Sequence, residues 1–478
     1  MPFTFENSGA YLRAVQVHFD TLLASGLATY GKRPCAMWMA SLDTGTGRYP
    51  ENDARPTAVG KRVYRNIDAP RGCSLYWDQP SIVAAHALCC VTGESRYAAA
   101  ADAYVRDFLN RCVSFSNMFL WGNHYYYDAF RESVVRFVVD EDPVPCDPAA
   151  DPGDLHEIRP IPPAWGSFWR VSPEMTESAI RAAAAGHVVD PATGEFQRHA
   201  EHRRGCAFLE AGGILVESLA WLFEKTGDAG LANLAGKIAG YSFRHRHPVT
   251  GLLENNPTAT RWDKHTATTE VGLWANSLMR ASERTGRSEW LEMADLAVSS
   301  WLRFGYDASR QQYYGRLAVA DGRPILGAKT TPYQPRDYSD IWEPLFPTHD
   351  YPLCFAEACL SLFAATGREE YLVAAERWSD IIQETLLAPD GRGRYAEQYG
   401  RCIHFLLRLE KATGKPRPGD LTARIAHEAM SVLFTGEMFR GHPGENRYDA
   451  VDGVGFLLLA LIQLGAGQPP PDLMGLGW

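Results

Sequence analysis

The sequence predicts an all-α protein, an (α/α)6 or (α/α)7 toroid in which an inner ring of helices lies within an outer ring. Two observations predict this fold. The dipeptide Thr-Gly recurs between apolar runs of helical spacing, and a Gly directly after a helix commonly ends it. These dipeptides begin at Thr92, Thr226, Thr285, Thr366 and Thr413. Alternate runs are almost entirely apolar while their partners are amphipathic, as expected of buried and half-exposed helices.

The helical runs can be placed along the whole chain. Thirteen are predicted, over residues 9–26, 79–91, 95–111, 173–187, 206–225, 229–245, 267–284, 289–303, 352–365, 369–387, 395–412, 419–435 and 448–465. Aromatic and β-branched residues at 119–139 predict an inserted β-hairpin. The long segments 112–172 and 304–351 are expected to build the binding site. Since no low-complexity linker divides the chain, residues 1–478 are expected to form a single catalytic domain.

Composition narrows the class of protein. Apolar residues make up 46% and charged residues 22%, which are ordinary globular values, and the net charge is −10. An acidic chain without a basic stripe argues against a nucleic-acid partner, and no apolar run reaches the length of a membrane span. The N-terminal residues lack the features of a secretory signal, and ten scattered cysteines lack a C-x-x-C pair. A cytoplasmic location is therefore expected.

One stretch, residues 119–128, places Asn123 and His124 among aromatic residues, with Tyr127 three positions after the His. This spacing resembles the Asn-Asn-His-x-x-Tyr motif of polysaccharide lyases built on helical toroids, including the alginate lyases, although Gly122 stands at the first Asn. The resemblance implies β-elimination on a uronic-acid polymer such as alginate or glucuronan. It further implies that Asn123 holds the carboxylate and that His124 acts as the base or neutralises the charge.

The segments that precede the inner helices should all open at one end of a toroid. They are rich in His, Arg, Tyr, Trp and acidic residues, and helix capping accounts for only some of these side chains. We expect an oligo- or polysaccharide to bind at this end of the toroid, because aromatic rings stack on sugars and polar side chains form hydrogen bonds with hydroxyl groups. The candidate substrate-binding residues are Trp77, Asp78, Trp121, His199, Arg203, Arg261, His349, Tyr351, Tyr399 and Arg401.

Elimination beside a carboxylate needs a group that neutralises the carboxylate, a base and a proton donor to the leaving oxygen. Arg, Asn and His can neutralise, while His and Tyr can transfer protons. The candidate catalytic residues are Asn123, His124, Tyr126, Tyr127, Arg204, His265, Glu270 and Tyr314. Spacing does not choose among the tyrosines. No metal and no cofactor is expected, since the chain lacks His-Glu-x-x-His, a dinucleotide-binding motif and a P-loop.

Two other enzyme classes remain open. A glycoside hydrolase of similar shape needs two carboxyl groups about the scissile bond, and Asp78, Glu270, Asp350 and Asp452 precede or begin inner helices. A sugar 2-epimerase or isomerase of the N-acylglucosamine 2-epimerase type, also a helical toroid, would use a pair of histidines for proton transfer. His265 and His349 could form such a pair.

Overall fold

A computed structural model describes residues 5–50, 69–122, 124–136, 143–149, 156–201, 204–257, 264–327, 335–342, 351–387, 393–416 and 420–467. These ranges contain fourteen α-helices. Their bounds are α1 Phe5–Ser25, α2 Leu75–Thr92, α3 Ser95–Arg111, α4 Trp165–Val171, α5 Pro173–His187, α6 Leu209–Thr226, α7 Ala229–Arg244, α8 Thr268–Thr285, α9 Ser288–Gly305, α11 Leu353–Thr366, α12 Glu369–Leu387, α13 Ala396–Thr413, α14 Leu421–Leu433 and α15 Val454–Ala466. Within the described ranges no helix combines the length and hydropathy needed to cross a bilayer.

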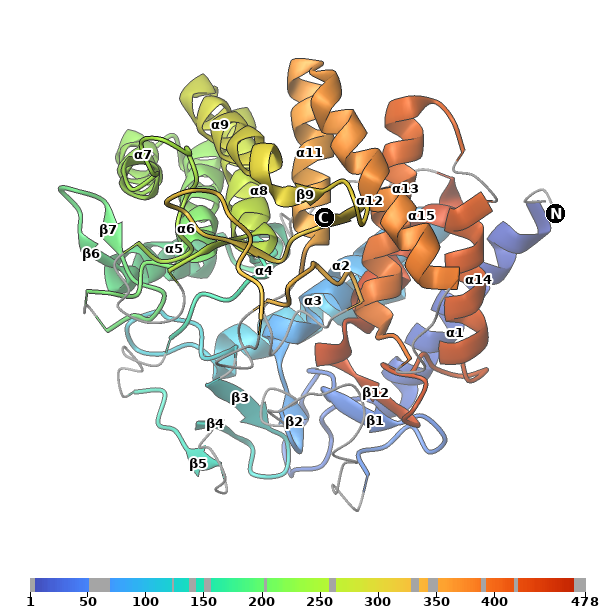
Figure 1. The fold of residues 1–478 in the computed structure, drawn as a ribbon. Helices are drawn as coiled ribbons and strands as arrows, with labels where there is room; N and C mark the ends of the chain where they lie inside the picture. Colours follow the sequence, from blue (N-terminus) through green and yellow to red (C-terminus); the bar gives the residue numbers. More distant parts are fainter. Residues whose placement is uncertain are drawn as a thin grey trace.

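The helices form an (α/α) toroid (Figure 1). Six long inner helices pack side by side in the order α6, α8, α11, α13, α15 and α2, and each packs against an outer helix. The outer partners are α7, α9, α12, α14, α1 and α3 in the same order. Between α3 and α6 the chain forms the short α4 and then α5; α4 contacts α3 and α5, and α5 contacts α6. The toroid therefore has six long inner helices.

The Thr-Gly repeat has a physical cause in these helix ends. Each Gly caps an inner helix in the left-handed conformation, with φ between 67° and 76°, which only Gly adopts without cost. Each Thr hydroxyl donates to the carbonyl four residues earlier and accepts the N–H two residues later. A single Thr thus supports both the end of the inner helix and the turn to the outer one.

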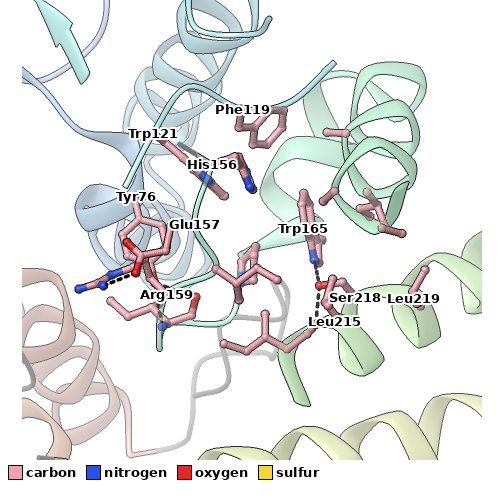
Figure 2. Close-up of a pocket in the computed structure, with 18 residues that line it drawn as sticks. Tyr76, Phe119, Trp121, His156, Glu157, Arg159, Trp165, Leu215, Ser218 and Leu219 are labelled. Atoms are coloured by element: carbon pink, nitrogen blue, oxygen red, sulfur yellow. Dashed lines mark hydrogen bonds and ion pairs between the residues drawn. The ribbon is translucent and has the colours of Figure 1, made fainter. Parts of the chain in front are cut away.

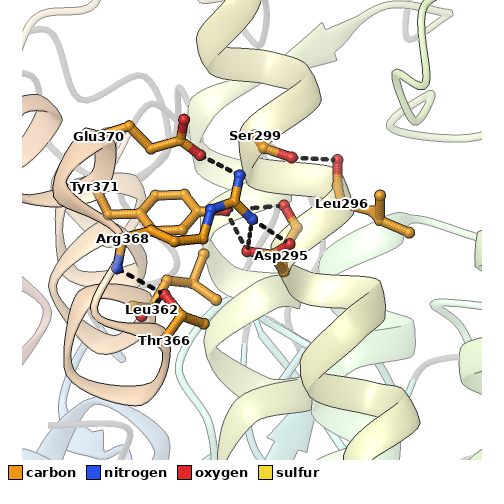
Figure 3. Close-up of polar contacts among 8 residues, drawn as sticks. All are labelled: Asp295, Leu296, Ser299, Leu362, Thr366, Arg368, Glu370 and Tyr371. Atoms are coloured by element: carbon orange, nitrogen blue, oxygen red, sulfur yellow. Dashed lines mark hydrogen bonds and ion pairs between the residues drawn. The ribbon is translucent and has the colours of Figure 1, made fainter.

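Close backbone approach and polar contacts both hold the helices together. Inner helices approach at backbone distance: for example, a Cβ on Gly400 of α13 would meet the Phe456 carbonyl carbon of α15 at 2.4 Å, and one on Gly272 of α8 would meet the backbone of α11. The outer helices α9 and α12 are tied by polar contacts. Arg368, just before α12, binds both carboxylate oxygens of Asp295, and Tyr371 donates to the same residue (Figure 3).

The strands are short and lie outside the rings, with β1 to β5 and β12 gathered on one side of the helices (Figure 1). The largest sheet has the order β2-β3-β4-β5 and is antiparallel. Its strands are β2 Gly72–Cys73, β3 Tyr125–Asp128, β4 Ser133–Arg136 and β5 Val144–Pro145. The two-stranded sheets pair β1 Ser41–Asp43 with β12 Arg447–Asp449, β6 Val188–Asp190 with β7 Glu195–Phe196, β8 Thr266–Ala267 with β11 Arg316–Leu317, and β9 Tyr306–Asp307 with β10 Gln312–Tyr313.

Most of the predicted elements are confirmed. All thirteen helical runs are helices, and the predicted hairpin is β3 and β4. Two details were wrong. The seven-residue α4 was missed, because a helix of two turns between Pro163 and Ser172 is too short to show a period. The last inner helix begins at Val454 and not at 448, since the residues before it pair with β1 and then form a 3-10 turn.

Candidate active site

A cluster of charged side chains lies where two extended segments pair near the start of α6. Glu157 and His199 form an antiparallel bridge, with Ile158 N donating to Arg198 O at 2.9 Å and Ala200 N donating to His156 O at 3.0 Å. His124, which immediately precedes β3, comes from a third segment and contacts Glu157. Since inner helices α2 and α6 begin beside these segments, the cluster lies at the end of the toroid where the inner helices start.

Glu157 is the centre of this cluster. Its Oε1 lies 2.9 Å from Nη1 of Arg159, 2.8 Å from Nε of Arg198 and 3.4 Å from Nε2 of His199. Its Oε2 lies 3.3 Å from Nε2 of His124. The carboxylate and both guanidiniums are buried, whereas the side chains of His124 and His199 are 27% and 31% exposed. The two imidazoles are therefore the groups that a substrate can reach.

The arginines determine the charge of the buried part. Burial alone would raise the pKa of the Glu157 carboxyl, but the guanidiniums of Arg159 and Arg198 outweigh burial and hold this pKa well below its usual range. Glu157 is thus an anion beside two cations. Glu210, 3.7 Å from Arg198, is buried and its pKa is raised by that burial. Glu157, Arg159 and Arg198 by themselves carry one net positive charge behind the exposed imidazoles.

Two contacts hold the segment around Glu157 in place. His156 Nδ1 lies 2.7 Å from Nε2 of His187, whose Nδ1 lies 2.9 Å from the carbonyl of Gln197. This geometry assigns the Nδ1 proton to each ring, and burial lowers the pKa of His156 to about 4, so both rings are neutral. On the other side, Tyr76 of α2 accepts the N–H of Ile161 at 2.8 Å through its hydroxyl.

A mostly apolar pocket adjoins the cluster between α2, α4, α5 and α6. Figure 2 shows Tyr76, Glu157 and Arg159 on one side of this pocket and Trp165 and Ser218 on the other. The space open to water within it is about 40 Å³, which is too small for a sugar ring. A ligand as large as a sugar ring could therefore meet the cluster only at the exposed faces of His124 and His199.

The described part of the chain contains no group of three or more His, Cys, Asp and Glu side chains arranged to hold a metal ion as it stands. His124, His199 and Glu157 nevertheless carry imidazole and carboxylate donors of the kind that bind divalent cations. Their separations of 3.3 Å and 3.4 Å are wider than those of strong charge-assisted hydrogen bonds. If the cluster binds a cation, His124, His199 and Glu157 are the side chains that would hold it.

The structure brings together two of the predicted site residues, His124 and His199, whose ring centroids are 6.1 Å apart. Trp121 is buried in the wall of the adjoining pocket. Arg204 is exposed and pairs with Glu195 of β7 at 3.2 Å. Tyr314 lies elsewhere, in ring contact with Tyr338.

Most of the other predicted residues are buried and bonded within the protein. The Asp78 carboxylate accepts from Tyr104 at 2.6 Å and from Tyr448 at 3.2 Å, and burial raises its pKa to about 7. His265 lies against Asn255, Tyr399 donates to Glu428, and Arg401 donates to the hydroxyl of Tyr351. Trp77, Tyr126, Tyr127, Glu270 and Asp452 are buried as well. Each of these residues is at most 8% exposed, which leaves its side chain little surface for a substrate. Asn123, Arg203, Arg261, His349 and Asp350 lie outside the described residues.

Sequence reasoning missed Glu157, Arg159, Arg198 and Tyr76, which support the two histidines. One signal was present: charged residues alternate with Ile158 at positions 157–159, and a second basic run begins at Arg198. What the sequence does not reveal is the pairing of these two segments, because α4, α5, β6 and β7 separate them and nothing in either segment specifies its partner.

Comparison with known proteins identifies one family. The model of the family described as periplasmic pectate lyase matches residues 79–208, about a quarter of the chain and a stretch that contains His124, Glu157, Arg198 and His199. This match supports a carbohydrate-active enzyme. It also contradicts the expected cytoplasmic location, since a family of periplasmic enzymes points to a periplasmic or secreted protein. No curated protein matches the chain.

Several solved structures resemble the chain at low identity. An inactive variant of an α-1,6-mannanase from Salegentibacter sp. HEL1_6, in complex with mannotetrose, is 12% identical, covers 82% of this chain and 98% of its own, and has a TM-score of 0.45. A D-mannose isomerase is 12% identical over 79% of this chain and 87% of its own, with a TM-score of 0.46. The unsaturated glucuronyl hydrolase from Bacillus sp. GL1 is 15% identical over 63% and 83%, with a TM-score of 0.40.

Proposed function

We propose that the protein is a lyase that cleaves a uronic-acid polysaccharide of the pectate type by β-elimination. One observation carries this proposal: two half-exposed imidazoles, His124 and His199, flank a buried Glu157 whose charge is exceeded by that of Arg159 and Arg198. The match to pectate lyases over residues 79–208 supports the same reaction class. The test of this proposal compares alginate and glucuronan with pectate as substrates.

The charge of the cluster suits the first requirement of elimination. A uronate carboxylate must lose much of its negative charge before the carbon next to it releases a proton. The net positive charge of Glu157, Arg159 and Arg198 behind His124 and His199 attracts that carboxylate to the exposed imidazoles. Because the guanidiniums are buried, their field is weakly screened by solvent.

The imidazoles suit the second requirement. In the proposed step a neutral imidazole takes the proton from C5 of the uronate, the electron pair forms the C4–C5 double bond, and the bond from C4 to the bridging oxygen breaks. The departing oxygen takes a proton from the other imidazole when that ring is protonated, or from water. Glu157 holds both rings in position and does not itself take part in the transfer.

The two alternative classes find less support. A hydrolase that uses Asp78 would need a carboxyl that is accessible, and this side chain is fully buried and bound by two tyrosines. An epimerase that uses His265 meets the same difficulty, because this ring is 1% exposed and lies against Asn255.

The direct test is a panel of pectate, alginate, glucuronan and glycosaminoglycans, each incubated with the enzyme with and without a divalent cation. β-Elimination creates a conjugated C4–C5 double bond that absorbs in the ultraviolet, and we expect this absorbance to rise with pectate. The His124→Ala variant should leave it flat. New reducing ends without ultraviolet absorbance would instead mean hydrolysis and would overturn the proposal.

A further inference from the structure

A second solvent-filled groove, of about 750 Å³, lies beside the β2-β3-β4-β5 sheet and away from the His124 cluster. We call it the Arg48/Arg71 groove. Its wall includes Tyr30, Asp43, Arg48, Tyr49, Arg71 and Phe130. Arg71 directly precedes β2, and Phe130 follows β3 by two residues, so both come from the same end of one strand pair. The β2-β3 pairing therefore places Arg71 and Phe130 next to each other in the wall of the groove.

A ladder of rings positions one of its cations. The guanidinium of Arg71 lies 4.6 Å from the centroid of the Phe130 ring, and Phe130 in turn stacks on Tyr30 with centroids 4.6 Å apart. The Tyr30 hydroxyl accepts the N–H of Tyr49 at 2.7 Å, which anchors the ladder to the other wall. A guanidinium that rests on a ring by its face keeps its N–H edges available for a carboxylate.

Among the residues that the structure describes, the wall of the groove holds two arginines and one acid. Arg48 and Arg71 are exposed, and neither has an acidic partner within the part of the chain that the structure describes. Asp43 is the acid in the wall, and its Oδ1 accepts the N–H groups of Gly45 and Thr46 at 3.0 Å and 2.9 Å. Two available guanidiniums beside aromatic rings suit a ligand that carries carboxylates on a sugar chain.

The groove is connected to the active site by one strand. His124 lies directly before β3, and Asp128 at the end of β3 pairs with Gly72, while Ala129 N donates to Arg71 O at 3.0 Å. An extended strand rises about 3.4 Å per residue, so the six residues from His124 to Phe130 span about 20 Å. A polymer bound at His124 would need several sugar residues to reach Arg71.

We propose that the Arg48/Arg71 groove is a distal subsite that binds carboxylates of the same uronate chain, several sugars from the scissile bond. This proposal rests on the proposed lyase function for the identity of its ligand. It predicts that long substrates gain affinity from the groove and that short ones do not.

The experiment measures binding directly, so that it does not depend on turnover. Oligogalacturonates of increasing length are titrated calorimetrically into the His124→Ala protein, which prevents cleavage, and into the same protein with Arg48→Ala and Arg71→Ala. The matched control carries Arg13→Ala and Arg323→Ala, two exposed arginines outside the groove, and loses the same charge. Because all four arginines are exposed, we expect each variant to melt like its parent.

The expected result is a loss of about tenfold or more in affinity for long oligomers with the Arg48/Arg71 pair, no change for the shortest ones, and no loss with the Arg13/Arg323 pair. Equal affinities of the two double variants for long oligomers would overturn the proposal that the groove is a distal subsite. A neutral oligosaccharide of the same length that binds as well as the acidic one would overturn it too. Absence of any cleavage by the unmodified protein would sink the lyase proposal alone, because the binding comparison still reports on the groove.

Discussion

Glu157 Oε1 lies 2.8 Å from Nε of Arg198, and this contact joins the two extended segments that carry the active-site cluster. The same oxygen also lies 2.9 Å from Nη1 of Arg159, so one carboxylate forms ion pairs with two buried guanidiniums. A buried charge that loses its partner is strongly destabilising, whereas the intact set is tolerated. The geometry of His124 and His199 thus depends on a residue that the substrate does not reach.

The Glu157→Gln variant should show this dependence. Removal of the negative charge takes away the carboxylate that contacts both Arg159 and Arg198, and we expect a loss of about 3–5 kcal/mol in the free energy of unfolding. We also expect kcat/KM on pectate to fall by at least about 100-fold, because the imidazoles lose their anchor. Chemical denaturation and initial rates measure the two effects. Glu195→Gln is the control, since Glu195 is buried but pairs with Arg204; equal effects in both variants would contradict the role of Glu157.

The two exposed histidines should behave as a unit. We expect His124→Ala and His199→Ala each to lower kcat by about 10²- to 10⁴-fold, the range for loss of a positioned proton-transfer group. The double variant should be little worse than either single one, because residues that act together are not additive. Steady-state rates on pectate measure this, with His245→Ala as the control on the exposed end of α7. Fully additive losses would mean that the two rings work independently.

The sequence was sufficient for the toroid because its signals are local. Each Thr-Gly pair specifies a helix end by its own hydrogen bonds, and each apolar run specifies an inner helix. The cluster was found only in part, since His124 and His199 stood out by residue type. Glu157 and Arg198 did not, because their importance comes from a long-range pairing of two short segments. Asp78 was conspicuous at the start of α2, yet its partners Tyr104 and Tyr448 make it a core residue.

A divalent cation should increase activity if the cluster accepts one. His124 and His199 each lie within 3.4 Å of an oxygen of Glu157, and a cation bound by these side chains would neutralise a uronate carboxylate more strongly than the arginines alone. We expect EDTA to lower the rate on pectate and added Mn²⁺ or Ca²⁺ to restore it. Binding of Mn²⁺ is measured independently by calorimetry. A rate that EDTA leaves unchanged would assign the neutralisation to the arginines and imidazoles.

Because the inner helices pack at backbone distance, one added methyl group between them should lower the stability of the protein. A Cβ on Gly400 would lie 2.4 Å from the backbone of Phe456, which cannot move without shifting α15. We expect Gly400→Ala to destabilise the protein by about 1–3 kcal/mol, or more if the helices cannot separate. On the outer helix α7, Gly240→Ala would meet only the end of Arg244 at 3.4 Å and should be neutral or stabilising by up to about 1 kcal/mol. Urea unfolding of both variants measures the contrast, and similar changes in the two would contradict backbone contact in the ring.

Asp78 should make the stability of the protein depend on pH. Burial raises the pKa of its carboxyl from 3.8 to about 7, so between these values the folded state binds a proton that the unfolded state has released. Stability contributed by this group is therefore present at low pH and is lost as pH rises toward 7. Relative to Asp78→Asn, which cannot titrate, the unmodified protein should lose about 2–3 kcal/mol between pH 5 and pH 8. Urea unfolding of both proteins at the two pH values measures this difference. A constant difference would mean that Asp78 stays ionised in the folded state. The Asn variant should retain cleavage of pectate, because Asp78 lies in the core, and loss of that activity in a folded variant would return the carboxyl to the active site.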